Sequence, residues 1–132
     1  MWVVSNPLRP DLVRRGQRLK VENETRLTEV VRDLLLALGP WSRLRGLLGR
    51  SLVSGQGLLL RPCRGVHTFF MGYPIDVIFL DKDGVVLALF AELRPWRATP
   101  FVDGACCALE LAAGQASSTQ TVVGDRLLFL KV

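Results

Sequence analysis

A hairpin pattern near the middle of the chain constrains its fold more than any other feature. Two β-rich runs, PIDVIFLD and VVLALFAEL, flank the tetrapeptide DKDG at residues 81–84. The Asp-Gly step tolerates the positive φ that tight turns between antiparallel strands need. Residues 74–93 are therefore predicted to form a β-hairpin, and the Asp81 and Asp83 carboxylates are interpreted as turn residues.

Other β-signals lie on both sides of this hairpin. They are RLKVE at 18–22, GLLL at 57–60, VHTFF at 66–70, ACCALELAAG at 105–114 and the end of GDRLLFLKV at 124–132. The composition of 105–114 also permits a helix, but its context favours a strand. The chain is thus expected to be rich in β-structure.

Residues 27–38 have two readings. Their apolar residues recur at the spacing of an amphipathic helix. Gly39 and Pro40 end this segment, and Ser42 can cap a short helix over 43–49. By periodicity alone, 27–38 is a helix.

Length and composition fit one folded domain. The chain has 132 residues, of which 49% are apolar, which is enough to build a core without metals or disulfides. Residues 1–17, with two prolines and several arginines, are expected to form an irregular arm, and 18–132 the domain. The start lacks the continuous apolar stretch of a signal peptide, and no window suits a membrane span, so a cytoplasmic protein is expected.

The net charge of +5 comes mostly from arginine, which suits contacts to carboxylates and phosphates. The charge is spread along the chain, with a mild concentration at Arg9, Arg14, Arg15, Arg18 and Lys20. This spread disfavours a specific nucleic-acid binder. An acidic protein partner for the arginine-rich arm remains a hypothesis.

The cysteines and the single histidine do not suggest a metal site. Cys63, Cys106 and Cys107 are odd in number and form no CxxC pair. In an extended chain Cys63 would lie about 13 Å from His67, so a Cys-His nucleophile would need a sharp bend. No structural metal and no cofactor are expected.

The order of six motifs resembles a known family. The motifs are RLRGLLGR at 43–50, GLLL at 57–60, PCRGVHTFFMGYPIDVIFLDKDGVV at 62–86, LRPWR at 93–97, LEL with a following glycine at 109–114 and GDRL at 124–127. Together they resemble the bacterial and archaeal family of unknown function numbered 192, over about residues 18–132. The family typically has aromatic-Trp-Met-Lys-Asn at its centre, where this chain has Phe69, Phe70, Met71, Gly72 and Tyr73.

This resemblance implies a mainly β (α+β) fold, a compact antiparallel β-sandwich or barrel-like domain with one or two short helices. It implies no established activity or cofactor. It also implies that residues 29–37 are a strand, and we adopt this over the helical reading because tertiary context commonly overrides propensity.

Two residues of the central motif are candidates for a site. His67 could be a general base or a ligand, although a histidine hydrogen-bonded to a neighbour at a strand end is the favoured reading. Asp76 falls on an apolar strand face, where a carboxylate needs a partner. That partner is either an arginine of the short helix, such as Arg43, or backbone NH groups in a loop; a structural role is favoured over a binding role.

Three functional hypotheses follow. The favoured one is a non-enzymatic ligand-binding or accessory module with a small-molecule pocket near His67, Met71, Asp76, Trp96 and Arg43. The second is an enzyme that uses His67 with Asp76 or an arginine. The third is an interaction protein that docks through its arginine-rich arm. The lone histidine and the lack of a nucleophile motif favour the first.

Overall fold

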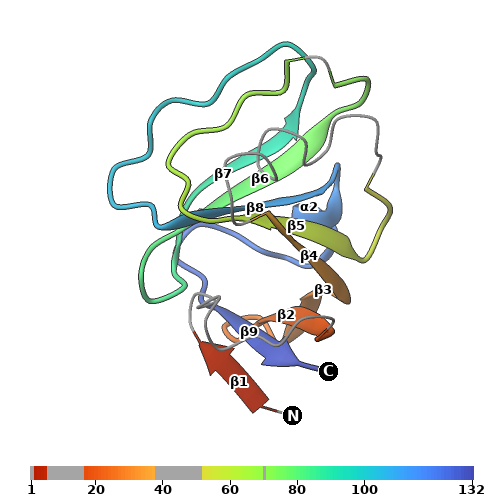
Figure 1. Ribbon diagram of the computed structural model, residues 1–132, viewed down its shortest axis with the longest axis vertical. Coiled ribbons are helices and arrows are strands. Elements are labelled where there is room, and N and C mark those ends of the chain that lie inside the picture. The colour runs from red at the N-terminus through yellow and green to blue at the C-terminus, as the bar shows by residue number, and fades with distance from the viewer. Residues whose placement is uncertain (1, 6–16, 38–51, 70) are drawn as a thin grey trace.

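The computed structural model describes residues 2–5, 17–37, 52–69 and 71–132. Their strands form two sheets (Figure 1). The first sheet has the order β1-β9-β2-β3, with bounds Trp2–Ser5, Leu127–Lys131, Leu19–Asn23 and Thr28–Val31. The second has the order β4-β5-β8-β6-β7, with bounds Asp33–Ala37, Gln56–Leu60, Cys107–Ala112, Ile75–Leu80 and Val86–Leu93. Neither described sheet closes into a barrel, so the domain is sandwich-like.

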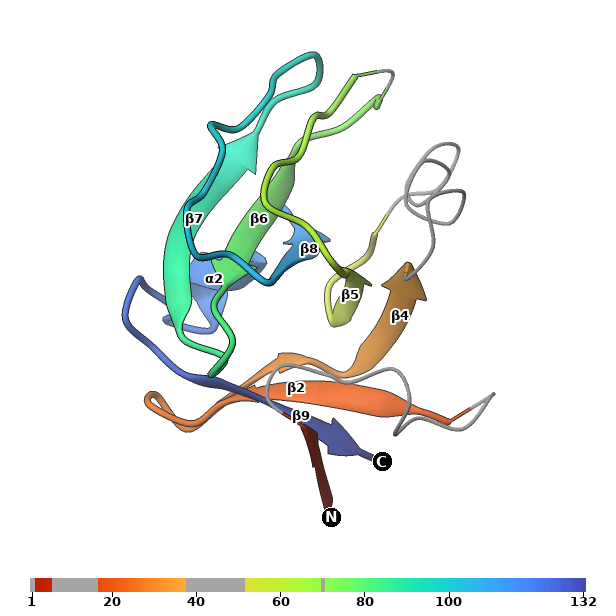
Figure 2. The ribbon, with the colours of Figure 1, turned by 60° about the vertical axis from the view of Figure 1, so that its left-hand side comes forward.

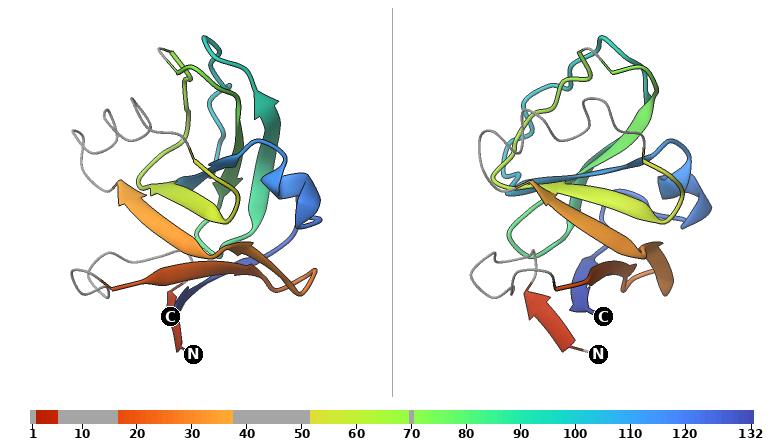
Figure 3. Two further views of the ribbon diagram at one scale, coloured as in Figure 1. Left: turned by 90° about the vertical axis from the view of Figure 1, so that its right-hand side faces the viewer. Right: turned by 45° about the vertical axis from the view of Figure 1, so that its right-hand side comes forward.

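The two sheets lie one above the other, with both termini beside the four-stranded sheet (Figure 3). All strand pairs are antiparallel except β4 with β5, which is parallel. Gly57 of β5 lies close to the end of β3, because a Cβ added at this glycine would lie 2.7 Å from a methyl carbon of Val31. The mainly β expectation is confirmed, with one parallel pair in place of a wholly antiparallel arrangement.

The β6-β7 hairpin forms as predicted. Asp81 Oδ1 accepts hydrogen bonds from the backbone NH groups of Asp83, at 2.8 Å, and Val85, at 3.0 Å. Gly84 has φ +81°, the conformation that the Asp-Gly step allows. The two aspartates are therefore turn residues.

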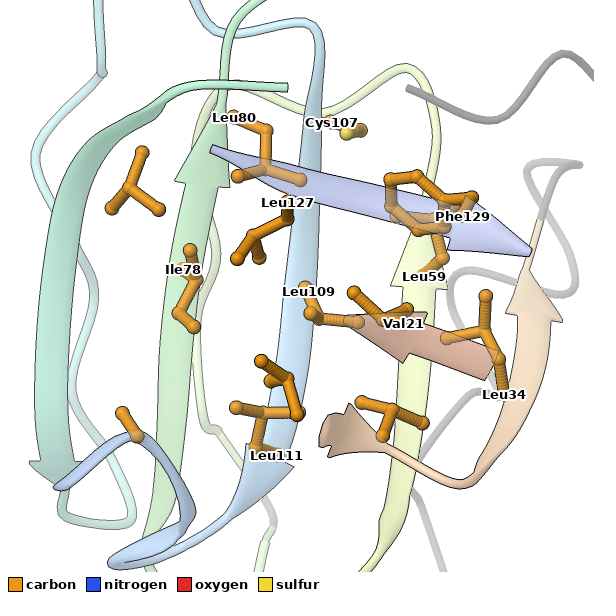
Figure 4. Packing of buried hydrophobic residues seen from close by; sticks show 14 of the residues in the cluster. Val21, Leu34, Leu59, Ile78, Leu80, Cys107, Leu109, Leu111, Leu127 and Phe129 are labelled. Atoms are coloured by element: carbon orange, nitrogen blue, oxygen red, sulfur yellow. The ribbon is translucent and has the colours of Figure 1, made fainter. Parts of the chain in front are cut away.

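One apolar cluster fills the space between the sheets (Figure 4). We call it the inner cluster; it includes Val21 and Phe129 from the first sheet and Leu59, Ile78 and Leu109 from the second. All five side chains are fully buried. This cluster holds the two sheets together.

A second cluster, the outer cluster, covers the other face of the five-stranded sheet. It includes Leu58, Val77 and Phe79 from the strands, and Cys63 and Met71 from a loop. Along β6, Val77 and Phe79 face this cluster while Ile78 faces the inner one, as strand alternation predicts.

Residues 28–31 and 33–37 are strands and not helix, so the strand that the family resemblance implied over 29–37 is present as two strands that separate at Arg32. The chain leaves the first sheet after β3 and enters the second with β4, and the NH groups of Arg32 and Asp33 both donate to the carbonyl oxygen of Gly55 at this junction. Val30, Val31 and Leu34 are consequently all buried in the inner cluster. Because the chain changes sheets at Arg32, the alternation of buried and exposed residues restarts there. The combined spacing of apolar residues then resembles that of an amphipathic helix.

The other strands, the helices and the N-terminal arm expected from the sequence agree with the structure only in part. Strands overlap the predicted ranges 18–22, 57–60, 105–114 and 124–132, although β2 and β5 each extend one residue beyond their range. The prediction of a strand at VHTFF was wrong: only an isolated bridge pairs His67 with Ala98. Helix α2, Gln115–Ser118, was not predicted. Within the expected arm, β1 pairs with β9, whereas the short helix over 43–49 lies outside the described residues.

Candidate functional site

Two loops project from the five-stranded sheet and run side by side (Figure 2). We call residues 61–69 and 94–106 the tip ribbon. Backbone hydrogen bonds join its two halves: Cys63 N to Cys106 O (3.3 Å), Val102 N to Arg64 O (2.8 Å), Thr99 N to Val66 O (2.8 Å), Thr68 N to Arg97 O (2.8 Å) and Trp96 N to Thr68 O (3.0 Å). The ribbon is thus a hydrogen-bonded projection and offers a fixed surface.

Thr68 is the central anchor of the tip ribbon. It is fully buried, and its Oγ1 donates to the carbonyl oxygen of Arg94 at 2.6 Å and accepts from the NH of Arg97 at 3.0 Å. Its backbone oxygen also accepts from the NH of Met71 at 3.2 Å. Sequence reasoning passed over this threonine, because only the fold shows which loop it meets.

Three exposed rings stack in a row on the tip ribbon, and we call them the aromatic column. The ring centroids of His67 and Phe69 lie 4.7 Å apart with an interplanar angle of 30°, and those of Phe69 and Trp96 lie 5.8 Å apart at 23°. Phe69 is 40% and Trp96 55% exposed. Trp96 has φ +62°, which is uncommon for a bulky residue. The hydrogen bond from its NH to the backbone oxygen of Thr68, in the opposite loop, holds this conformation.

His67 lies at one end of the column. Its Nδ1 accepts a hydrogen bond from the NH of Phe69 at 3.3 Å, which leaves Nε2 directed away from that contact. None of the hydrogen bonds or ion pairs described for His67 joins it to a carboxylate. This is the neighbour-bonded histidine that the sequence analysis favoured, on an exposed loop.

Two open surface hollows lie beside the tip ribbon: the first is lined by His67 of the column, and the second by Arg94 and Arg97, the arginines that precede and follow Trp96 in the sequence. The first encloses about 500 Å³ and is lined in part by Arg64, His67 and Phe101. The second encloses about 550 Å³ and is lined in part by Glu92 and Arg97. The two hollows share no lining residue.

Among the predicted site residues that the structure describes, His67 and Trp96 are brought together. His67 and Trp96 meet through Phe69 in the aromatic column. Met71 is buried in the outer cluster, and Asp76 is fully buried on the opposite face of β6. Arg43 lies outside the described residues.

Asp76 uses both carboxylate oxygens within the fold. Oδ1 accepts from the NH of Glu92 at 2.8 Å and Oδ2 from the NH of Ala116, in α2, at 2.9 Å. Opposite Asp76, β7 carries an extra residue: the register shifts there and Glu92 has φ +51°, the features of a β-bulge. The sequence analysis allowed backbone NH groups of a loop as the second kind of partner; backbone NH groups are observed, but they belong to strand β7 and helix α2.

Glu110 is a site candidate that sequence reasoning passed over. It lies in the central strand β8, between Leu58 of β5 and Val77 of β6, and is only 5% exposed. Its carboxyl makes no hydrogen bond or ion pair with the described residues, and burial raises its pKa from the usual 4.5 to about 7. The sequence feature that could have pointed to Glu110 is the LEL motif at 109–111, in which one acid stands between two leucines of an apolar run.

The cysteines gather near the base of the tip ribbon. Cys63 and Cys107 are buried, and Cys106 is partly exposed. A hydrogen bond from Cys107 lowers the pKa of Cys106 to about 6, assisted by the charge of Arg61, while the pKa of Cys107 is raised. The Cys63 thiol donates to the carbonyl oxygen of Gly65 at 3.2 Å. Cys106 is thus the more acidic thiol of the adjacent Cys106-Cys107 pair.

The described residues contain neither a metal-binding cluster nor a membrane-spanning helix. No group of three or more His, Cys, Asp or Glu side chains among them is arranged to hold a metal ion. No helix in that same part of the chain has the length and apolarity to cross a bilayer.

The fold and the projecting ribbon define a small two-sheet β-protein. The chain belongs to the DUF192 family, described as "Uncharacterized ACR, COG1430", whose model matches residues 20–129. No curated protein matches this chain.

Two solved structures share the fold. One is a protein of unknown function from Novosphingobium aromaticivorans DSM 12444, with a TM-score of 0.72 and 21% identity over 83% of this chain and 82% of that one. The other is a "putative transcription regulator" from Sinorhizobium meliloti 1021, with a TM-score of 0.68 and 24% identity over 84% of this chain and 91% of that one. At these identities the likeness concerns the fold alone.

Proposed function

We propose that this chain is a small ligand-binding or accessory module that acts without catalysis, and that its site is the aromatic column. The observation that supports the proposal is the row of three exposed rings, spaced at 4.7 and 5.8 Å. Aromatic rings on a protein surface favour offset stacking against another ring or against an apolar molecular face. A ligand with a flat ring would extend the column.

The way the column is held also supports the proposal. Exposing Phe69 and Trp96 to water forgoes the stabilisation that burial gives such side chains. The fold nevertheless fixes them, through the buried Thr68 and the positive φ of Trp96. A prearranged site loses little side-chain freedom when a ligand binds.

The proposed site revises the pocket expected from the sequence. It keeps His67 and Trp96 and adds Phe69, because these three rings stack. Asp76 is left out, since two backbone NH groups already occupy its oxygens.

An NMR titration tests this function. The ¹⁵N-labelled protein would be titrated with nucleosides, aromatic carboxylates and monosaccharides. We expect at least one class to shift the amide signals of Phe69 and Arg97 and the indole NH of Trp96. Thr68→Val removes the hydroxyl that anchors the ribbon but keeps a similar shape, and should weaken those shifts.

The matched control is Leu27→Ala. Leu27 is an apolar residue that is 88% exposed in the turn between β2 and β3, away from the tip ribbon. This variant should respond like the parent protein. Ligand-induced shifts confined to residues outside the tip ribbon would contradict the proposed site.

A further inference from the structure

The tip ribbon concentrates positive charge that is dispersed in the sequence. Its two segments contain Arg61, Arg64, Arg94 and Arg97, against a single acid, Asp103. In the sequence these arginines lie in two pairs some thirty residues apart, which is why no basic cluster is visible there. The backbone hydrogen bonds between the loops bring the pairs into one projection.

The arginines occur at both ends of the aromatic column. At the His67 end, Arg64 and His67 line the same hollow. At the Trp96 end, a guanidinium nitrogen of Arg97 donates to the backbone oxygen of Trp96 at 3.5 Å, and Arg97 and Arg94 line the other hollow. A flat ring on this column would therefore have cationic side chains on either side.

We propose that the tip ribbon binds single-stranded nucleic acid, with a base stacked on the aromatic column and phosphates contacting the arginines; this rests on the function proposed above. Arginine pairs well with phosphate, and base stacking on aromatic side chains is a general mode of binding single strands. Every base has a flat face, so this recognition is independent of sequence.

Charge on two sides of the column distinguishes a strand from a mononucleotide. A strand carries a phosphate on each side of every internal base, whereas a mononucleotide carries phosphate on one side only. Glu92 shares the second hollow with Arg94 and Arg97 and would repel a phosphate placed next to its own carboxylate. The phosphate contacts at that end are accordingly assigned to Arg97, beside Trp96.

Fluorescence anisotropy of a labelled ten-nucleotide oligo(dT) tests the proposal, in the full chain at 50 and 200 mM salt. We expect binding that weakens as salt rises. Arg64→Ala and Arg97→Ala should each reduce the slope of log affinity against log salt by about 0.7, the value for one lost contact to a single strand. Arg32→Ala, which removes an exposed arginine at the β3-β4 junction, is the matched control and should leave the slope unchanged.

Stacking is tested in the same assay. Trp96→Ala should weaken binding roughly tenfold, and Trp96→Phe, which keeps a ring, should restore most of the loss. Phe69→Ala gives a second reading if the Trp96 variant fails to fold, as judged by its melting temperature. Unlabelled oligo(dT) should compete at least tenfold better than dTMP.

The outcomes separate this proposal from the function on which it rests. Binding of thymidine at Phe69 and Trp96, without arginine-dependent or salt-dependent binding of oligo(dT), would overturn the strand proposal and leave a site for neutral rings. Equal competition by dTMP would identify a mononucleotide site instead. If no ring compound shifts the column signals and oligo(dT) does not bind, both proposals fail.

Discussion

The inner cluster and the tip ribbon use the same kinds of side chain in opposite ways. Phe129 in the inner cluster is fully buried, whereas Phe101 in the ribbon is 77% exposed. The inner cluster is held by apolar contact between two sheets. The ribbon is held by backbone hydrogen bonds and the buried Thr68, and at its base Cys63 and Ala105 pack in the outer cluster. The difference separates residues that stabilise the fold from residues that the fold displays.

The largest expected effect comes from comparing two phenylalanines. Phe129→Ala should lower the free energy of unfolding by about 4 kcal/mol, because it opens a cavity between the sheets. Phe101→Ala should change it by less than about 0.5 kcal/mol. Urea denaturation measures both. Equal losses would mean that the ribbon is part of the stabilising core.

The next largest expected effect is a pH dependence of stability caused by Glu110, which is buried on the central strand β8. Its pKa is raised to about 7 in the folded protein, so the protonated form is favoured by folding. The associated stability is present below pH 4.5 and is lost as the pH rises through 7, by about 3 kcal/mol. Glu110→Gln should remove this dependence, seen as the difference between unfolding free energies at pH 5 and pH 8. An unchanged pH profile in the variant would assign the dependence to another group.

The third prediction concerns Asp76, a buried carboxylate in which each oxygen accepts a hydrogen bond from a backbone NH group. Asp76→Asn replaces one acceptor oxygen by an NH₂ group that faces a backbone NH, so we expect a loss of about 2 kcal/mol. Hydrogen exchange at the Glu92 and Ala116 amides should accelerate in the same variant. If those two amides stay protected, water or another side chain has taken over the acceptor role.

The smallest effect concerns reactivity and not stability. Cys106 should be alkylated by iodoacetamide well before Cys63 and Cys107, with a rate that rises through about pH 6. Mass spectrometry of peptides from partly alkylated protein measures the order. Arg61→Gln should shift the Cys106 profile to higher pH, since it removes a cationic neighbour. Faster labelling of Cys107 would contradict the assignment.

Local pattern determined much of the fold. The DKDG turn specified the β6-β7 hairpin, and alternation placed Ile78 in the inner cluster and Val77 in the outer one. The order of motifs indicated the family, which the match over residues 20–129 confirms. These features need only neighbours in sequence, or a motif order that the sequence itself carries.

Contacts between distant segments decided the rest. Helical spacing over 27–38 was misleading because the chain changes sheets at Arg32. Phe69 and Trp96 are 27 positions apart, and only the pairing of two irregular loops stacks them. The partners of Asp76 and the isolation of Glu110 likewise depend on which segments pack around them. Sequence thus determined which strands could form, while the candidate site arises from loop pairings that no local pattern encodes.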